Sequence, residues 1–290
     1  MLSTDQAGLG QPDDGHGMIG AMGHSGSDGI VAAAVGPAAR WLLLTAAGLA
    51  VVQAGPGVTA LGPVRRGLFP RLCGSGPAGH VALTFDDGPD PASTPYFLDL
   101  LAARKVRATF FLLGSMAARA PGLAAEIAAA GHEIGVHGWE HRYLPLRGPR
   151  ASYADVQRAT DAIASITGAT PRLFRPPYGV LSAAALAAAR RLGLTPVLWT
   201  CWGREWTPGS TPESVYATLA RNLAGGATVL LHDSDCTSPA GSSLAALGAV
   251  PMLLDECTRR GLQVGSLAEH GIGSAEYRRA RLDLIGGAAR

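Results

Sequence analysis

Two histidines and a neighbouring pair of carboxylates are the residues of this sequence best suited to hold a metal ion. Asp86 and Asp87 are adjacent, and His137 and His141 stand four positions apart, so both imidazoles can reach one ion. Two imidazoles and the carboxylate of Asp87 make a three-ligand set with an open position for water or substrate, which is typical of catalytic zinc sites. The second carboxylate could then take a proton from metal-bound water. The histidine spacing alone also fits a pair of surface histidines, but the double aspartate favours a metal centre.

Further polar residues could complete such a centre. Arg175 could hold Asp86 ionised and in place through a charge-assisted hydrogen bond. His232 is a candidate acid that protonates a leaving group, and its alternative role is that of a hydrogen-bonded core histidine. Asp233 beside it could cap or orient a neighbouring group.

The elements that must position these residues form an alternating series of strands and helices from His80 onward. The predicted strands are 80–85, 108–113, 132–137, 172–175, 196–201, 227–232 and 262–264. One of the predicted helices spans 117–130. Polar residues follow five of the strands at their carboxyl ends, which is the edge where α/β barrels form active sites. The pattern predicts a parallel barrel or near-barrel of about seven βα units.

Several other classes of protein are excluded. Lys and Arg number 24 against 22 Asp and Glu, a net charge of +2 that gives no support to nucleic-acid binding. After His132-Glu133 the next histidine comes one position too late for the His-Glu-x-x-His metalloprotease motif. The sequence has no Gly-x-Ser-x-Gly elbow, phosphate-binding loop or dinucleotide fingerprint. Its four cysteines form no Cys-x-x-Cys pair, and whether Cys201 and Cys236 pair is left open.

The segment before the predicted barrel poses a membrane question. Residues 1–29 are rich in Gly, His, Asp and Ser, and we expect a disordered terminus there. Residues 41–63 carry no charge and are long enough to span a bilayer, so within 30–78 we expect either a membrane anchor or a helix packed on the domain. Arginines follow this stretch, which by the positive-inside rule would favour a cytoplasmic domain. A solvated tail is expected at 271–290.

Four short motifs resemble those of the polysaccharide deacetylases, the NodB-homology carbohydrate esterases of family 4. TFDDGP at 84–89 is similar to the first motif and HGWEH at 137–141 to the second. RPPYG at 175–179 matches the third, and LLHD at 230–233 matches the fifth. The motifs occur in order, and the resemblance places the deacetylase domain at 79–270.

The resemblance implies a distorted (β/α)7 barrel that hydrolyses N-acetyl groups of glycans with a divalent metal. By that resemblance Asp86 is the base, His232 is the acid, and Arg175 supports the base. The resemblance likewise assigns Asp87, His137 and His141 as metal ligands. The backbone N–H of Tyr178 would help to hold the oxyanion. The expected substrate pocket contains Trp206, Pro177 and Leu230.

The sequence departs from the family pattern at two motifs. Gly138 stands where the family usually has Ser or Thr, which removes a hydroxyl that would steady the loop. The fourth motif usually reads Asp-x-x-Asp-Trp, and here it is 202–206, with Trp202 and Glu205 in place of the two aspartates. Glu205 is one methylene longer than Asp, so its pairing with His232 depends on geometry that the sequence does not supply.

The expected function is therefore metal-dependent removal of N-acetyl groups from peptidoglycan or a chitin-like glycan. Zinc is the first choice of metal, and cobalt, nickel, manganese and iron are alternatives. Two other hypotheses remain: a deacylase of a lipid-linked sugar at a membrane, and a glycan-binding relative without activity. Family habit favours the cell envelope, whereas the flanking arginines favour the cytoplasm.

Overall fold

The structure, a computed structural model, describes residues 37–272 of the 290-residue chain. The predicted disordered segment 1–29 and nearly all of the predicted tail 271–290 lie outside the described residues. Three elements precede the barrel: α1 (Pro37–Ala54), the 3-10 helix η1 (Gly55–Ala60) and α2 (Gly62–Leu68).

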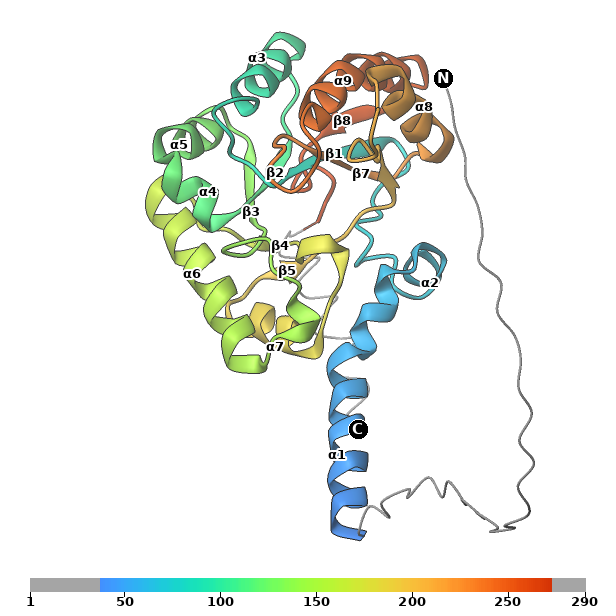
Figure 1. Ribbon diagram of the computed structural model, residues 1–290. Coiled ribbons are helices and arrows are strands. Elements are labelled where there is room, and N and C mark those ends of the chain that lie inside the picture. Colours follow the sequence, from blue (N-terminus) through green and yellow to red (C-terminus); the bar gives the residue numbers. More distant parts are fainter. Residues whose placement is uncertain (1–36, 273–290) are drawn as a thin grey trace, which may run out of the picture. The chain divides into compact units, whose positions relative to one another are not determined.

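Eight parallel strands form one sheet within the described residues, with helices outside it (Figure 1). The strands are β1 (His80–Asp86), β2 (Thr109–Leu112), β3 (Glu133–Val136), β4 (Leu173–Phe174), β5 (Thr195–Pro196), β6 (Cys201–Trp202), β7 (Thr228–His232) and β8 (Gln263–Gly265). The helices are α3 (Thr94–Arg104), α4 (Gly114–Arg119), α5 (Pro121–Ala129), α6 (Pro149–Thr167), α7 (Ala183–Arg191), α8 (Pro212–Asn222) and α9 (Ser242–Arg259), with short 3-10 turns η2 (Leu144–Leu146) and η3 (Pro177–Gly179). The sheet order is β5-β4-β3-β2-β1-β7-β6, with β8 paired to β1. The prediction of a distorted α/β barrel is confirmed.

Strand β1 lies inside this sheet between β2 and β7 and is buried on both faces. After His80 each of its residues is buried, and β2 and β7 flank it in parallel register. Phe85 packs against Phe97 of α3 and Phe110 of β2, with ring centroids 5.0 Å apart in both pairs. Burial on two faces explains why the strand reads as a continuous apolar run rather than an alternating one.

The single strand predicted at 196–201 is wrong. The segment forms two short strands at opposite edges of the sheet, β5 paired with β4 and β6 paired with β7. Between them the Val197 N–H donates to Phe174 O at 2.9 Å, and the Thr200 N–H donates to Thr228 O at 3.0 Å. The chain crosses here from one edge of the curled sheet to the other, so it closes the barrel covalently without a β5–β6 ladder.

The helix predicted at 117–130 is also corrected, because it divides in two. Pro121 begins α5 and has no N–H to donate to the preceding turn, and Ala120 before it adopts a non-helical conformation. A proline disfavours helical geometry at the residue before it, so the break falls where the sequence places Pro121.

Candidate active site

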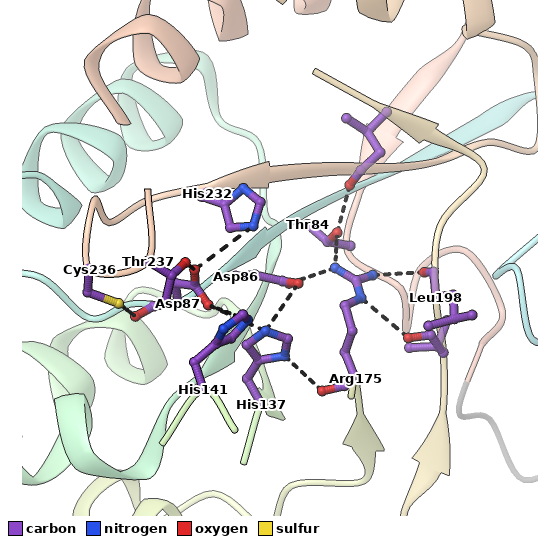
Figure 2. A network of polar contacts seen from close by, with 12 residues as sticks. Thr84, Asp86, Asp87, His137, His141, Arg175, Leu198, His232, Cys236 and Thr237 are labelled. Atoms are coloured by element: carbon purple, nitrogen blue, oxygen red, sulfur yellow. Dashed lines mark hydrogen bonds and ion pairs between the residues drawn. The ribbon is translucent and has the colours of Figure 1, made fainter. Parts of the chain in front are cut away.

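The two adjacent carboxylates lie at the carboxyl end of β1 and point in different directions. Asp86 is the last residue of the strand, and Asp87 has a φ of 79°, a left-handed conformation that costs energy for a residue with a Cβ. Both side chains are almost completely buried. The turn sends Asp87 toward two histidines and leaves Asp86 facing Arg175 (Figure 2).

Asp87, His137 and His141 converge on one point. The Asp87 Oδ1 atom lies 3.4 Å from His137 Nε2 and 3.6 Å from His141 Nε2. Ligands about 2.0–2.1 Å from a tetrahedral ion stand roughly 3.4 Å apart, so this spacing suits a zinc-sized metal. Asp87 Oδ1 is buried and has no hydrogen-bond partner among the described residues, as expected for an atom that serves as a ligand. The three residues therefore fit a divalent metal ion.

The protonation states of these groups also suit metal binding. The His137 Nδ1 atom lies 2.7 Å from Arg175 O, and because a carbonyl can only accept, Nδ1 carries the proton and Nε2 keeps its lone pair. Burial lowers the pKa of His141 to about 4, which keeps it neutral. Burial alone would raise the pKa of Asp87, but the interactions with His137, His232 and His141 hold it well below its usual range.

Arg175 fixes the second carboxylate. Its Nη1 atom donates to Asp86 Oδ1 at 2.7 Å and to Thr84 Oγ1 at 2.7 Å. Its Nη2 donates to Leu198 O at 2.9 Å, and the guanidinium stacks on the Phe111 ring at 4.0 Å. Arg175 is fully buried, so this ion pair is shielded from water and held by several donors at once. The other oxygen of Asp86, Oδ2, lies 3.7 Å from His137 Nε2, beside the ligand cluster.

His232 also lies beside the cluster and is paired with Glu205. Its Nδ1–H donates to Glu205 Oε1 at 2.6 Å, and its Nε2 lies 4.0 Å from Asp87 Oδ2. Burial alone would lower the pKa of His232. The hydrogen bond to Glu205 and the negative charges of Glu205, Asp87 and Asp86 raise it to about 9. Glu205 is fully buried and follows Arg204, whose φ of 59° turns the loop inward.

A cavity of about 320 Å³ opens over these groups, within the usual range for small-molecule sites. It is lined by Asp86, His137, His141, Tyr178, Gly179, Trp199, Trp202, Trp206, Leu230, His232, Thr237, Ser238 and Pro239. Trp206 stands edge-on to His232, with ring centroids 5.4 Å apart. Tyr178 has a φ of 59°, and its ring lies 4.2 Å from the His141 ring.

Comparison with known proteins gives the family. The family profile for polysaccharide deacetylase matches residues 74–197. A chitooligosaccharide deacetylase from Bradyrhizobium sp. is 36% identical over 197 residues, which cover 65% of this chain and 89% of that protein. The chain belongs to the polysaccharide deacetylase family. A peptidoglycan-N-acetylglucosamine deacetylase from Bacillus cereus is 35% identical over 65% of this chain and 86% of its own length.

The fold of this polysaccharide deacetylase agrees with solved structures of the family. A family 4 carbohydrate esterase from Streptomyces lividans, solved in complex with acetate, superposes with a TM-score of 0.58. The two chains are 32% identical over 64% of this chain and 92% of that one. The two relatives named above are deacetylases, and this chain is likewise a hydrolase that acts on amide bonds.

The structure explains why a glycine, Gly138, fits the second motif of this deacetylase. Gly138 has a φ of 90°, and a Cβ added there would lie 3.0 Å from Asp155 Oδ2. The same Asp155 oxygen accepts the Trp139 N–H at 3.0 Å. A carboxylate from α6 thus holds the loop between the two histidines at the place where a Ser or Thr hydroxyl is missing.

The structure places the altered fourth motif directly at the site. The longer Glu205 reaches His232, and Trp202 joins Trp199 and Trp206 in an aromatic row, with ring centroids 5.8 and 5.5 Å apart. Leu230 and Trp206 are among the residues that line the cavity. Pro177 is buried and is not among the described residues that line the cavity. The left-handed turn at Tyr178 presents the tyrosine to the cavity in its place.

Sequence reasoning missed the loop that follows β7. Thr237 Oγ1 donates to Asp87 Oδ2, and Cys236 Sγ lies 3.6 Å from Asp87 O. The only sequence signal is that this loop follows the LLHD motif directly. Cys236 is exposed and Cys201 is buried, and both are free thiols.

Proposed function

We propose that this chain hydrolyses the N-acetyl amide of an N-acetylated glycan, such as peptidoglycan or a chitin-like oligomer, and releases acetate and a free amine. One observation carries the proposal. A carboxylate held by Arg175 and a histidine held by Glu205 both lie beside the ligand cluster, with Asp86 Oδ2 3.7 Å from His137 Nε2 and His232 Nε2 4.0 Å from Asp87 Oδ2.

In this proposal Asp87, His137 and His141 hold a divalent ion, with zinc as the first choice. When bound, such an ion would polarise the amide carbonyl and acidify a water molecule. The neutral imidazoles and the unpaired Asp87 Oδ1 support this assignment.

The remaining steps belong to the side chains of this chain. Asp86 accepts a proton from the attacking water through Oδ2, because Oδ1 is occupied by Arg175. The backbone N–H of Tyr178 donates to the oxygen that gains negative charge. His232 donates its Nε2 proton to the departing nitrogen as the C–N bond breaks, and Glu205 stabilises the protonated ring.

The test is acetate release by the full-length protein on chitooligosaccharides and on peptidoglycan fragments, with added Zn²⁺ or Co²⁺. Asp86→Asn should abolish release. Asp99→Asn, a change of the same kind at an exposed site on α3, should leave it intact. Release that survives Asp86→Asn would contradict the assigned base. Bound metal without release from either glycan would favour a lipid-linked sugar, and silence without metal binding would favour a non-catalytic relative.

A second proposal concerns location. The stretch Arg40–Ala60 is long and apolar enough to cross a membrane, and only 6% of its most apolar window is buried. Leu44, Leu49, Val51 and Val52 are each 62–71% exposed, which a lipid environment explains better than burial against the domain. We propose that this stretch anchors the protein at the cell envelope. Recovery of the full-length protein in the soluble fraction after cell lysis would contradict the anchor.

A further inference from the structure

The segment that precedes β1 packs behind residues that line the cavity. The family match begins at residue 74, yet Cys73 is fully buried and Arg65 of α2 is only 5% exposed. Leu72 packs against the cluster of Leu198, Trp199 and Leu230. The Leu198 N–H donates to Leu72 O at 2.7 Å, so the backbone of this segment is tied to the strand connection that carries Trp199.

Arg65 stacks on Trp199. Its guanidinium carbon lies 4.7 Å from the centroid of the indole ring. Trp199 lines the cavity and is 6% exposed, whereas Arg65 is absent from the described lining residues. A planar guanidinium on an aromatic face fixes the ring plane in a way that a flexible apolar chain does not. Arg65 Nε has no hydrogen-bond partner among the described residues, so a buried charge is retained here without full compensation.

Trp199 in turn contacts the turn that carries Tyr178. A Cβ added to Gly179 would lie 2.9 Å from Trp199 Cζ3, so the indole packs directly against the backbone of that glycine. Gly179 follows Tyr178, whose N–H we assign to the oxyanion. The contacts therefore run from Arg65 through Trp199 to the turn that must hold this N–H in place.

We propose that Arg65 is a positioning residue of the active site, which fixes the plane of Trp199 and through it the turn at Tyr178 and Gly179. The catalytic domain then begins upstream of residue 74, and α2 belongs to it. The expected kinetic effect rests on the proposed function, whereas the contact between Arg65 and Trp199 rests on geometry alone.

A purely structural role for Arg65 makes a different prediction. If only the apolar stem of the side chain matters, a methionine, which keeps an unbranched apolar stem, should replace it with little effect on turnover. If the planar cation positions Trp199, Arg65→Met should lower kcat more than it raises KM, because the oxyanion contact strengthens only in the transition state. Misplacement of a positioned group by about 1 Å can cost on the order of 100-fold in rate.

The experiment compares full-length wild type, Arg65→Met, Arg65→Lys and Arg66→Met, the last being the exposed neighbour on α2. We expect Arg65→Met to lower kcat by about 10- to 100-fold with KM changed by less than threefold, Arg65→Lys to recover part of the loss, and Arg66→Met to match wild type. Thermal unfolding checks that each variant folds. Wild-type kcat in folded Arg65→Met would overturn the proposal.

A spectroscopic arm keeps the contact testable if the proposed function fails. Trp199 and Trp202 lie 5.8 Å apart and should give a near-ultraviolet circular dichroism signal that depends on the plane of Trp199. In the otherwise wild-type protein, Arg65→Met should change this signal. In a protein that also carries Trp199→Phe, the same substitution should leave the signal unchanged. If wild type releases no acetate while this pattern holds, the proposed function fails and the positioning contact stands. An unchanged spectrum in Arg65→Met would refute the contact, whatever the activity.

Discussion

Removing the negative charge of Glu205 should restrict acid catalysis by His232 to low pH, whereas in wild type His232 stays protonated through the neutral range. Glu205→Gln keeps the size of the side chain and an oxygen that can accept the His232 Nδ1–H, but it removes the negative charge. Burial lowers the pKa of His232, and Glu205, together with the charges of Asp87 and Asp86, raises it to about 9. Without the charge, this pKa should fall toward its ordinary value of 6.5.

The size of the effect depends strongly on pH. With a pKa of about 9, roughly three quarters of His232 is protonated at pH 8.5, whereas with a pKa of 6.5 only about 1% is. For a variant pKa of 6.5, the activity ratio of wild type to variant should be about 75-fold at pH 8.5 and less than about twofold at pH 6.

The assay is kcat/KM for acetate release between pH 5.5 and 9.5, with thermal unfolding at each pH. Glu126→Gln, at an exposed position of α5, is the matched control and should follow wild type. If Glu205→Gln lowered kcat/KM by the same factor at every pH, Glu205 would only orient the His232 ring. Equal activity at pH 8.5 would refute the role of His232 as the acid.

Three further outcomes are expected. His137→Ala should weaken zinc binding, measured by calorimetry, by more than about 100-fold, and unchanged affinity would refute the ligand set. Gly138→Ser, which inserts a residue type common in the family, should destabilise the fold by about 1–2 kcal/mol, because φ is 90° and the Cβ approaches Asp155; an equal or higher melting temperature would contradict this. Burial raises the pKa of Asp233 to about 7, so the stability that depends on its protonated form is full below about pH 4 and is lost as the pH rises through 7. Asp233→Asn should therefore raise the melting temperature relative to wild type more at pH 8 than at pH 5. A difference in melting temperature that is the same at both pH values would contradict the raised pKa of Asp233.

Local patterns in the sequence determined the fold class and the residue types of the site. Continuous apolar strands with helices between them predicted a parallel barrel, and polar residues after the strands predicted which edge carries the chemistry. Asp86, Asp87, His137 and His141 were found this way because each lies at or just beyond the end of a strand, and strand ends can be read from local hydrophobicity. The motif set that indicated the family is likewise a set of short local patterns.

Tertiary structure alone decided how these groups are held. The division of 196–201 between two edges of the sheet depends on barrel closure, which brings together strands that are far apart in the chain. The reach of Glu205 to His232 depends on a left-handed residue at Arg204 that no propensity predicts. The stacking of Arg65 on Trp199 joins positions 134 residues apart, and Thr237 reaches Asp87 across 150 residues. Such contacts leave no periodic trace in the sequence, because they are set by packing between elements rather than by the backbone preference of any one of them.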